Sequence, residues 1–466
     1  MSQPHARIAI IGGGPGGYEA ALVAAQLGAE VTVVERDGLG GACVLTDCVP
    51  SKTLIASSGM MAALDASPGL GLRINAEGNG AAHVDAPRLY ARVRALARAQ
   101  SDDVATRMAA EGVKVVSGTG RLLGPRTVAV GDTTLDADAV LIATGAEPRV
   151  LPGAAPDGER ILTWRQLYDL TELPAELIVV GSGVTGAEFA SAYQALGSQV
   201  TLVSSRDRVL PNEDTDAAMV VEDVFRRNGM TVLSRSRAAT VSRGGDAVTV
   251  TLTDGRTIDG THCLMTVGMV PCTSGLGLAE AGVEVDDGGF VRVDKVSRTS
   301  APGVYAAGDC TGVLMLASVA AMQGRIAMWH ALGEAVKPLR LTNVAATIFT
   351  EPEIATVGIP ETAVASGEVP DAVVVKLPLA TNARAKMQGF RDGFVKLIAH
   401  HSSGTVLGGV IVAPRASELI LAVSLAVERR LTVDHVAQTF AVYPSLSGSV
   451  TEAARRLMQS AEASTG

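Results

Sequence analysis

RIAIIGGGPGGYEAALVAAQLGAEVTVVE, residues 7–35, decides the fold, because it reads in order as a strand, a glycine turn, a helix and a second strand. Gly12, Gly14 and Gly17 form the pattern G-x-G-x-x-G. The first glycine allows a tight turn, the second lets the backbone approach a pyrophosphate, and the third lets the helix pack closely on the strand. Glu35 ends the second strand, where a carboxylate can accept hydrogen bonds from ribose hydroxyls. The stretch therefore predicts a dinucleotide-binding fold.

The same pattern recurs in LIVVGSGVTGAEFASAYQALGSQVTLVS, residues 177–204, as Gly181, Gly183 and Gly186. Two fingerprints in one chain imply two dinucleotide sites. Such a pair suggests an electron relay between FAD and a nicotinamide nucleotide. The alternative is a duplicated fold that has lost its second ligand.

The second copy differs from the first at the ribose position, since Ser204 stands where the first copy has Glu35. Without an acid at this position a 2′-phosphate is not repelled, and Arg206 or Arg208 could pair with it. We therefore expect the chain to accept NADPH, with NADH not excluded. The alternative is that these arginines belong to a solvated surface.

Composition excludes several classes of protein. A length of 466 residues is too great for one core and predicts two or three domains. The formal net charge of −9 and the 3% aromatic content argue against a nucleic-acid groove. The apolar stretch near residues 410–427 is interrupted by Pro414, Arg415 and Glu418, so we expect core packing and no membrane insertion. The N-terminus lacks a signal-peptide pattern, and five cysteines are too few for a secreted disulfide scaffold, which predicts a cytoplasmic protein.

The rest of the chain gives a coarser pattern. Residues 101–150 alternate β-rich runs with glycine and proline turns, and residues 230–270 predict a strand meander. VYAAGDC, residues 304–310, predicts a strand that ends at Gly308. From about Leu339 the chain changes to strands, FVKLIA and VLGGVIV among them, followed by helices, which predicts a third, α+β domain.

Further motifs carry a family resemblance over nearly the whole chain. Beyond the two fingerprints, they are GGACVLTDCVPSK at 40–52, ATG at 143–145, AAGDC at 306–310 and FTEPEIATVG at 349–358. In these motifs the chain resembles the flavoprotein disulfide reductases, also known as pyridine nucleotide-disulfide oxidoreductases, which include lipoamide dehydrogenase, glutathione reductase and mercuric reductase. The resemblance implies FAD, NAD(P)H and a homodimer.

With the resemblance, the predicted fold is α/β, with two Rossmann-like dinucleotide-binding domains and a C-terminal α+β dimerisation domain. We expect the FAD-binding domain in two parts, residues 1–147 and 271–338. Residues 148–270 would form the NAD(P)-binding domain, and residues 339–466 the dimerisation domain.

The resemblance also implies roles for individual residues. The predicted FAD contacts are Gly12, Gly14, Gly17, Glu35, Lys52, Gly118, Thr144, Gly145, Asp309 and Ala317, with Asp309 holding the ribitol. The predicted NAD(P) contacts are Gly181, Gly183, Gly186, Ser204, Arg206 and Gly268. Lys52 is expected near the flavin N5, where a cation stabilises negative charge, and is expected to pair with Glu188. No metal is expected.

Cys43 and Cys48 match the redox pair of the family, in which the first cysteine exchanges with substrate and the second contacts the flavin. Residues five positions apart on a regular helix are too distant for a disulfide, whose Cα atoms lie about 4.4–6.8 Å apart. We therefore expect an irregular first turn, which Pro50 permits, with Cys48 at a helix start. Cys263, Cys272 and Cys310 match no redox motif and are expected to be packing residues.

The thiol end of this relay lacks its usual proton donor. The family carries H-x-H-P-T-x-x-E near the C-terminus, but this chain has Ala441 and Tyr443 in place of the histidines and Gly448 in place of the glutamate. Tyrosine has a reference pKa of about 10 and is a poor proton shuttle near neutrality, although Tyr443 could contact a bound substrate. His435 and Glu452 are the alternative, as a displaced acid/base pair.

We therefore expect an NAD(P)H:quinone oxidoreductase, because quinones need no thiol exchange. DGERILTWRQLYDL (157–170), TNARAKM (381–387) and YPSLSGSVTEAARR (443–456) resemble the actinobacterial quinone-reductase branch of the family. A dihydrolipoyl dehydrogenase-like disulfide reductase that uses Cys43 and Cys48 is the first alternative, and a non-catalytic flavin-bearing redox-sensing subunit is the second. A mercuric reductase would need a C-terminal cysteine pair, and no cysteine follows Cys310.

Overall fold

The first nucleotide-binding unit is built on a five-stranded parallel sheet. The computed structural model describes residues 6–72 and 83–463 of the chain. The sheet has the order β18-β7-β1-β2-β3. Its strands are β1 (Arg7–Ile11), β2 (Glu30–Glu35), β3 (Lys114–Ser117), β7 (Ala139–Ile142) and β18 (Val304–Ala306). Because β18 comes from the second half of the chain, this unit is assembled from two distant segments.

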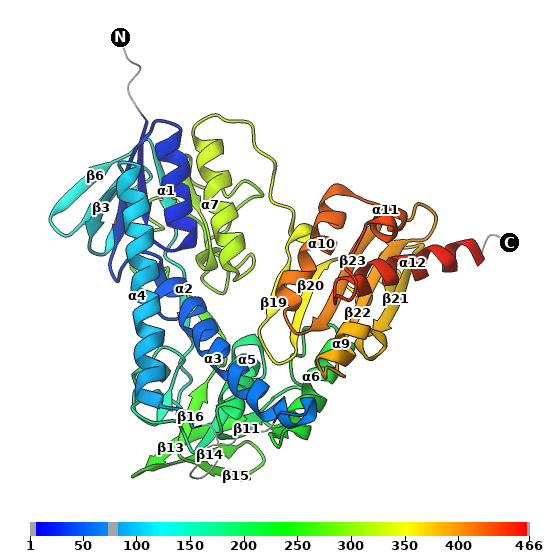
Figure 1. Ribbon diagram of the computed structural model, residues 1–466. Coiled ribbons are helices and arrows are strands. Elements are labelled where there is room, and N and C mark those ends of the chain that lie inside the picture. The colour runs from blue at the N-terminus through cyan, green and yellow to red at the C-terminus, as the bar shows by residue number, and fades with distance from the viewer. Residues whose placement is uncertain (1–5, 73–82, 464–466) are drawn as a thin grey trace.

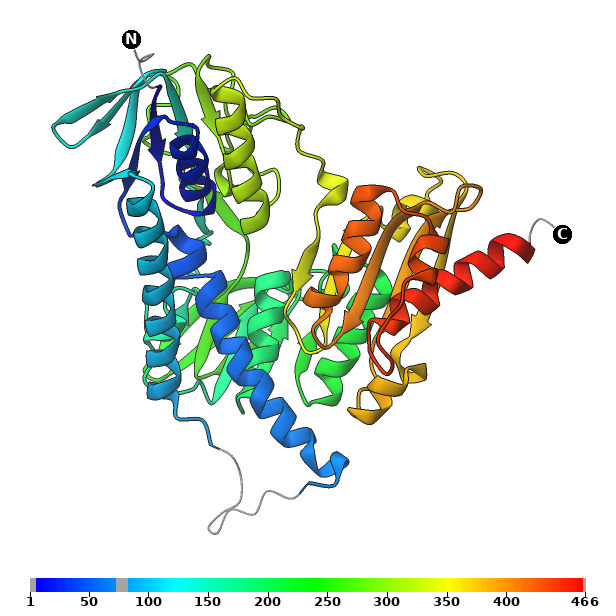
Figure 2. The same cartoon turned by 45° about the horizontal axis from the view of Figure 1, so that its top comes forward.

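Helices cover this sheet and extend beyond it. Helix α1 (Pro15–Gln26) and helix α7 (Ala317–Ala331) lie side by side on the first unit (Figure 1). Helix α3 (Cys48–Ala66) and helix α4 (Ala86–Ala110) run from the first unit to the second, where α3 packs on α5 (Val184–Ala195) (Figure 2). The short helix α2 (Gly41–Leu45) precedes α3. A small antiparallel sheet of β4 (Gly120–Gly124), β5 (Thr127–Val130) and β6 (Thr133–Asp136) completes the unit.

The second nucleotide-binding unit repeats the plan. Its parallel sheet has the order β12-β11-β10-β16-β9. The strands are β9 (Ile161–Leu162), β10 (Glu176–Val180), β11 (Gln199–Val203), β12 (Thr231–Leu233) and β16 (His262–Met265). Helix α6 (Thr215–Arg227) joins β11 to β12. An antiparallel meander follows, of β13 (Ala238–Gly244), β14 (Ala247–Leu252) and β15 (Thr257–Gly260).

The C-terminal unit is a five-stranded antiparallel sheet with helices. The sheet order is β19-β20-β23-β22-β21. The strands are β19 (Ala346–Ile348), β20 (Glu353–Gly358), β21 (Ala372–Pro378), β22 (Phe394–His400) and β23 (Val406–Ala413). The helices are α8 (Glu361–Ala365), α9 (Ala383–Met387), α10 (Ala416–Arg429), α11 (Val433–Gln438) and α12 (Gly448–Ala463). Figure 1 shows this unit set apart from the first and in contact with the second.

The predicted fold class is confirmed, with two parallel nucleotide-binding sheets and a C-terminal α+β unit. The first two units are joined where β8 (Ala146–Pro148) pairs with β17 (Met269–Pro271). The boundaries near residues 147, 270 and 338 remain a proposal.

One secondary-structure expectation was wrong, and a second was confirmed. The β-rich pattern expected from residue 101 starts only at β3, because residues 101–110 finish helix α4. Val93, Ala97, Val104 and Met108 lie buried on one face of that helix at helical spacing. The apolar stretch near residue 410 is β23 followed by α10, and none of the described helices is long and apolar enough to cross a membrane.

Candidate functional site

The first glycine turn is built for close backbone approach. Gly12 has φ +104°, and a Cβ atom on it would lie 2.3 Å from the carbonyl oxygen of Ala143. A Cβ on Gly17 would lie 1.9 Å from the carbonyl oxygen of Gly12, so Gly17 lets α1 pack against β1. Gly14 caps α1 without a side-chain hydrogen bond, and the nearest atom to a Cβ there is 4.0 Å away. The N–H groups of the first helical turn are therefore open to an anion.

Glu35 is held at the end of β2 by backbone amides. Its carboxylate accepts hydrogen bonds from the N–H groups of Gly13 (2.6 Å), Arg36 (2.8 Å), Asp37 (2.7 Å) and Gly38 (3.3 Å). Only one of these, from Gly13, goes to Oε2. Because a carboxylate oxygen offers two lone pairs, Oε2 can also accept a hydrogen bond from a ribose hydroxyl.

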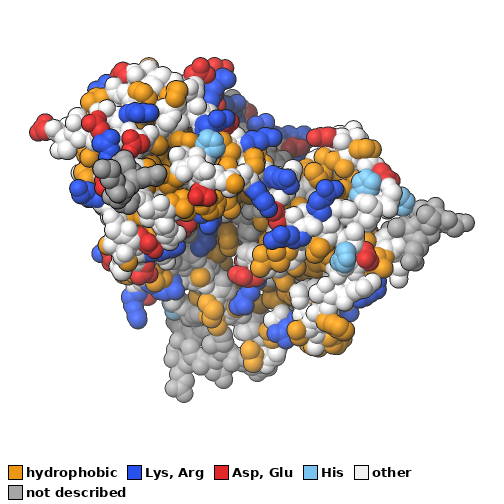
Figure 3. Space-filling view, turned by 90° about the horizontal axis from the view of Figure 1, so that it is seen from above, with side chains coloured by type: hydrophobic (Ala, Val, Ile, Leu, Met, Phe, Trp, Pro, Cys, Tyr) orange, Lys and Arg blue, Asp and Glu red, His pale blue; other side chains and the backbone are white. Residues whose placement is uncertain are grey.

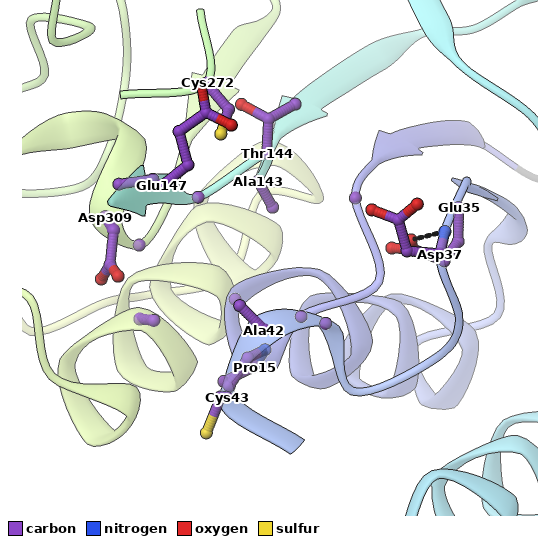
Figure 4. Close-up of a pocket in the computed structure, with 18 of the residues that line it drawn as sticks. Pro15, Glu35, Asp37, Ala42, Cys43, Ala143, Thr144, Glu147, Cys272 and Asp309 are labelled. Atoms are coloured by element: carbon purple, nitrogen blue, oxygen red, sulfur yellow. Dashed lines mark hydrogen bonds between the residues drawn. The ribbon is translucent and has the colours of Figure 1, made fainter. Parts of the chain in front are cut away.

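These elements open onto a cavity of ≈650 Å³ between α1, α2 and the β7–β8 turn (Figure 4). The volume is suited to a large organic cofactor. Among the predicted FAD contacts, those that line the cavity are Gly12, Gly14, Glu35, Gly118, Thr144, Gly145, Asp309 and Ala317. Gly17 and Lys52 do not line it, since Gly17 acts in helix packing and Lys52 lies further along α3. The cavity and its glycine turn fit FAD.

Asp309 supplies a buried carboxyl group to this cavity. It follows β18 at the left of Figure 4 and faces the space above α2. Burial, and then the negative charge of Asp47, raise the pKa of Asp309 to about 6. A hydroxyl donor would stabilise the carboxylate there, as expected for a ribitol contact.

Cys43 and Cys48 lie on two different helices. Helix α2 ends at Leu45 and α3 begins at Cys48, so Thr46 and Asp47 break the helix between the thiols. Both cysteines are free thiols that line the cavity. The pKa of Cys43 is lowered by a hydrogen bond from Cys48, while that same bond, together with burial, raises the pKa of Cys48. Cys43 is therefore the more readily ionised thiol of the pair.

Of the other cysteines, Cys263 and Cys310 are buried, as expected for packing residues. The packing interpretation is wrong for Cys272, which is partly exposed and lines the cavity beside Thr144 and Glu147 (Figure 4). The antiparallel pairing of β17 with β8 brings Cys272 there, and its backbone N–H bonds to the carbonyl of Gly145 at 3.0 Å.

Lys52 and Glu188 form an ion pair between α3 and α5. The Lys52 Nζ lies 2.7 Å from Glu188 Oε2, and the Glu188 side chain is only 4% exposed. Glu188 also accepts a hydrogen bond from the N–H of Phe349 at 2.9 Å, and the Lys52 ammonium lies 5.0 Å from the centre of the Phe349 ring. Burial alone would lower the pKa of Lys52, but the charge and hydrogen bond of Glu188, together with Cys48 and Asp47, outweigh burial, and the pKa is raised. Lys52 is therefore a fixed cation.

The second glycine turn has the same geometry. Gly181 has φ +114°, and a Cβ on Gly186 would lie 1.9 Å from the Gly181 carbonyl oxygen. A Cβ on Gly183 would have no neighbour within 4 Å, so the backbone there is open to a ligand. Gly268 lies between β16 and β17 and accepts a hydrogen bond from the N–H of Arg149.

Ser204 and Arg206 face opposite directions. The Ser204 side chain is fully buried and accepts a hydrogen bond from Ser182 at 2.7 Å. It also accepts from the N–H of Arg206 at 3.2 Å, which shapes the loop after β11. The Arg206 side chain is exposed. An anion at this loop would therefore meet Arg206 and not the Ser204 hydroxyl.

Tyr443 lies away from the two cysteines. It does not line the cavity, and its side chain is 85% exposed in the segment between α11 and α12. The displaced acid/base pair is wrong, because His435 bonds to Thr432 in a capping box and Glu452 pairs with Arg455 and Arg456.

Five charged residues that line the cavity were not singled out from the sequence, namely Arg36, Asp37, Asp47, Glu147 and Arg165. Asp47 lies within the cysteine motif, between Cys43 and Cys48. Arg165 stood in the TWRQLYDL segment, and the sequence offers no local sign that this segment reaches the cavity.

Comparison with known proteins agrees with this geometry. The sequence profile of the pyridine nucleotide-disulphide oxidoreductases matches residues 6–324, and that of their dimerisation domain matches residues 344–454. The chain is 58% identical over 466 residues to an NAD(P)H dehydrogenase (quinone) of Mycobacterium tuberculosis, covering 97% of this chain and 94% of that protein. It is 34% identical over 462 residues to a dihydrolipoyl dehydrogenase of Chlorobaculum tepidum, covering 97% of each.

Among solved structures, LpdA from Mycobacterium tuberculosis superposes with a TM-score of 0.92 at 56% identity, covering 97% of this chain and 100% of that one. The chain therefore belongs to the pyridine nucleotide-disulphide oxidoreductase family, whose members use FAD and NAD(P)H.

Proposed function

We propose that this protein is an NAD(P)H:quinone oxidoreductase. NAD(P)H and a proton would be consumed as a quinone becomes a hydroquinone. Bound FAD would supply the two-electron chemistry that joins the nicotinamide nucleotide to the acceptor. The relative of 58% identity is named for this activity.

The residues of the chain would act by binding and by electrostatics. The first glycine turn and Glu35 would hold the adenosine half of FAD, and Asp309 would hold its ribitol. Lys52 would keep a positive charge beside the reacting end, where negative charge develops during transfer. Glu188 would fix that cation through the 2.7 Å ion pair.

The observation that carries the choice of a quinone is the lack of the family's proton donor for the thiols. Ala441 and Tyr443 stand where the family has its two histidines, and Gly448 stands where it has the glutamate. Thiol–disulfide exchange needs a protonated leaving thiol, so it would proceed slowly here. A quinone needs electrons from the cofactor and protons that water can deliver.

Steady-state turnover with NADPH or NADH and a benzoquinone or naphthoquinone tests the proposal. We expect saturable quinone reduction that survives Cys43→Ser, because the thiols are not needed. Turnover no faster than that of free FAD at the same concentration would refute it.

A disulfide reductase is the second candidate, favoured by one observation. The lowered pKa of Cys43, caused by the hydrogen bond from Cys48, suits an attacking thiolate. This candidate predicts lipoamide reduction that is lost in Cys43→Ser, which is the opposite outcome for the same variant.

We also propose that the active form is a homodimer. The dimerisation-domain match covers residues 344–454, and Phe440, Val442 and Tyr443 are 104%, 77% and 85% exposed there. Viewed from above, hydrophobic side chains are exposed on both sides of the hollow between the first and C-terminal units (Figure 3). A second copy of the chain would cover such apolar surface. Light scattering of Phe440→Ser/Val442→Ser beside the unaltered chain tests this, with monomers expected for the variant.

A further inference from the structure

Arg165 enters the FAD cavity from the second nucleotide-binding unit. It follows β9 in the segment that leads to β10, and its side chain lines the cavity. Its neighbours Trp164 and Leu167 are 3% and 0% exposed, so the backbone that carries it is anchored in the core. The backbone position from which the guanidinium extends is therefore fixed by packing.

The Arg165 side chain is partly exposed, and one nitrogen of its guanidinium lacks a hydrogen-bond partner among the described residues. This atom, Nε, is shielded from solvent. A charged N–H group that is shielded from water without an acceptor carries a desolvation cost, which proteins normally offset with a hydrogen bond or an ion pair. An arginine in this state, on the wall of a cavity, indicates an anionic ligand.

The other charges on the cavity wall are already engaged or have the wrong sign. Arg36 makes two hydrogen bonds to Asp37, at 2.9 and 2.7 Å. Glu35 is satisfied by backbone amides. The remaining charged groups of the described lining are the acids Asp47, Glu147 and Asp309. Arg165 is thus the cation of this wall that is left to meet a negative ligand.

Arg165 also acts on both ends of the cavity. The pKa of Asp37, at the Glu35 end, is lowered first by its hydrogen bond with Arg36 and also by the charge of Arg165. Burial raises the pKa of Asp47, beside Cys48, and the charges of Lys52 and Arg165 oppose that rise. Because Arg165 lines the cavity and its charge reaches both carboxylates, it suits an anionic group that lies between the two ends of a bound cofactor. In FAD the diphosphate is the middle of the molecule, between adenosine and ribitol.

We propose that Arg165 binds the diphosphate of FAD and so completes, from the second unit, the anion site that the N-terminus of α1 begins. The bidentate fork of arginine suits phosphate oxygens, and the contact would pair both charges. FAD would then bridge the two nucleotide-binding units. The inference rests on FAD binding and not on the identity of the acceptor, so it can fail while quinone reduction stands.

The test measures the binding of FAD to the FAD-free Arg165→Met variant. The readout is the quenching of flavin fluorescence. A lost charge-assisted contact is expected to raise the Kd for FAD about 10- to 100-fold. Arg165→Lys keeps the charge but not the planar guanidinium. Its Kd for FAD should lie between those of the unaltered chain and Arg165→Met. Arg36→Met is the matched control, because Arg36 lies on the same wall with its charge already paired, and it should change the Kd less. ADP should lose affinity for Arg165→Met by the same factor as FAD, and riboflavin should lose none.

Thermal unfolding separates this role from a structural one. Without FAD, Arg165→Met should unfold at the same temperature as the unaltered chain or higher, because an unpaired charge is gone. With FAD, it should unfold at a lower temperature than the unaltered holoenzyme. An unchanged Kd, or an equal loss of melting temperature with and without FAD, would overturn the proposal.

Discussion

Lys52 shows how one residue is made into a permanent charge. It is held between the Glu188 carboxylate and the Phe349 ring, and both contacts favour the ammonium form. Its value to the reaction would lie in its charge and not in proton transfer, since its pKa is raised.

Lys52→Met should lower kcat for quinone reduction at least about tenfold, because charge developing beside the cofactor loses its counter-charge. FAD content should stay near that of the unaltered enzyme, since Lys52 does not line the cavity. Stopped-flow and steady-state rates, with FAD measured by absorbance, check this. An unchanged kcat at full FAD occupancy would contradict the assigned role.

Asp309 predicts a pH dependence of the FAD-free protein. Burial and Asp47 raise its pKa from 3.8 to about 6, so between these values the native chain holds a proton that the unfolded chain releases. The free energy of unfolding should fall as pH rises through this window, by up to about 3 kcal/mol. Asp309→Asn should remove this fall in the free energy of unfolding. The variant should be more stable than the unaltered chain at pH 7, and the difference in stability should disappear near pH 4. Urea unfolding at several pH values measures it, and parallel profiles for the two proteins would count against it.

At the scale of single residues, the sequence predicted contacts between residues that belong to known motifs. The Lys52–Glu188 pair was expected from the family resemblance and is present. The backbone amides that bind Glu35 were not predicted, since ribose hydroxyls were expected there. Cys272 and Arg165 could not be foreseen, because they reach the cavity through β17–β8 pairing and through the segment after β9. Those placements depend on tertiary structure.

The helices and strands make different demands on glycines that share one motif. Gly17→Ala would place a Cβ 1.9 Å from the Gly12 carbonyl, so α1 must move from β1. A melting temperature several degrees lower and poor FAD retention are expected. The Cβ of Gly14→Ala would meet no atom closer than 4.0 Å, so this variant should fold normally. Its only defect should be a lower affinity for FAD. Calorimetry of both FAD-free variants decides this, and equal destabilisation would be inconsistent with the geometry.

The elements around the two glycine motifs could be predicted because an apolar strand, a glycine turn, a helix and a second strand follow one another in a known order. The break between α2 and α3 was expected from the cysteine spacing, and it falls at Thr46 and Asp47. Residues 101–110 were misassigned because the buried face of α4 is thin, with Val104 and Met108 set among polar residues. Local pattern is weak where a helix buries few side chains.

At the scale of the whole molecule, a charge cluster around one buried lysine joins the second and C-terminal units. Lys396 on β22 is 1% exposed, and its Nζ lies 2.7 Å from Asp214 and 2.8 Å from Asp216, with Glu361 as a third partner. Asp214 caps α6 of the second unit. The ammonium group thus joins a helix start to a distant sheet.

Lys396→Met should lower the free energy of unfolding by about 3 kcal/mol, because Asp214 and Glu361 lose their counter-charge and Asp216 keeps only Lys376. Lys376→Met is the matched control, since Lys376 pairs with Asp216 at 2.9 Å but is 45% exposed, and it should cost at most about 1 kcal/mol. Urea denaturation compares the two. Equal losses of unfolding free energy in the two variants would contradict the role given to the burial of Lys396.

The order of the strands has a consequence for synthesis of the protein. Strand β18 (Val304–Ala306) and Asp309 complete the first sheet and its cavity, yet β1 is made long before them. A ribosome-bound nascent chain therefore lacks one wall of the FAD site until β18 and Asp309 have emerged. Cofactor capture must come late in translation, and a chain truncated before β18 should emerge as an open sheet edge that needs protection from aggregation.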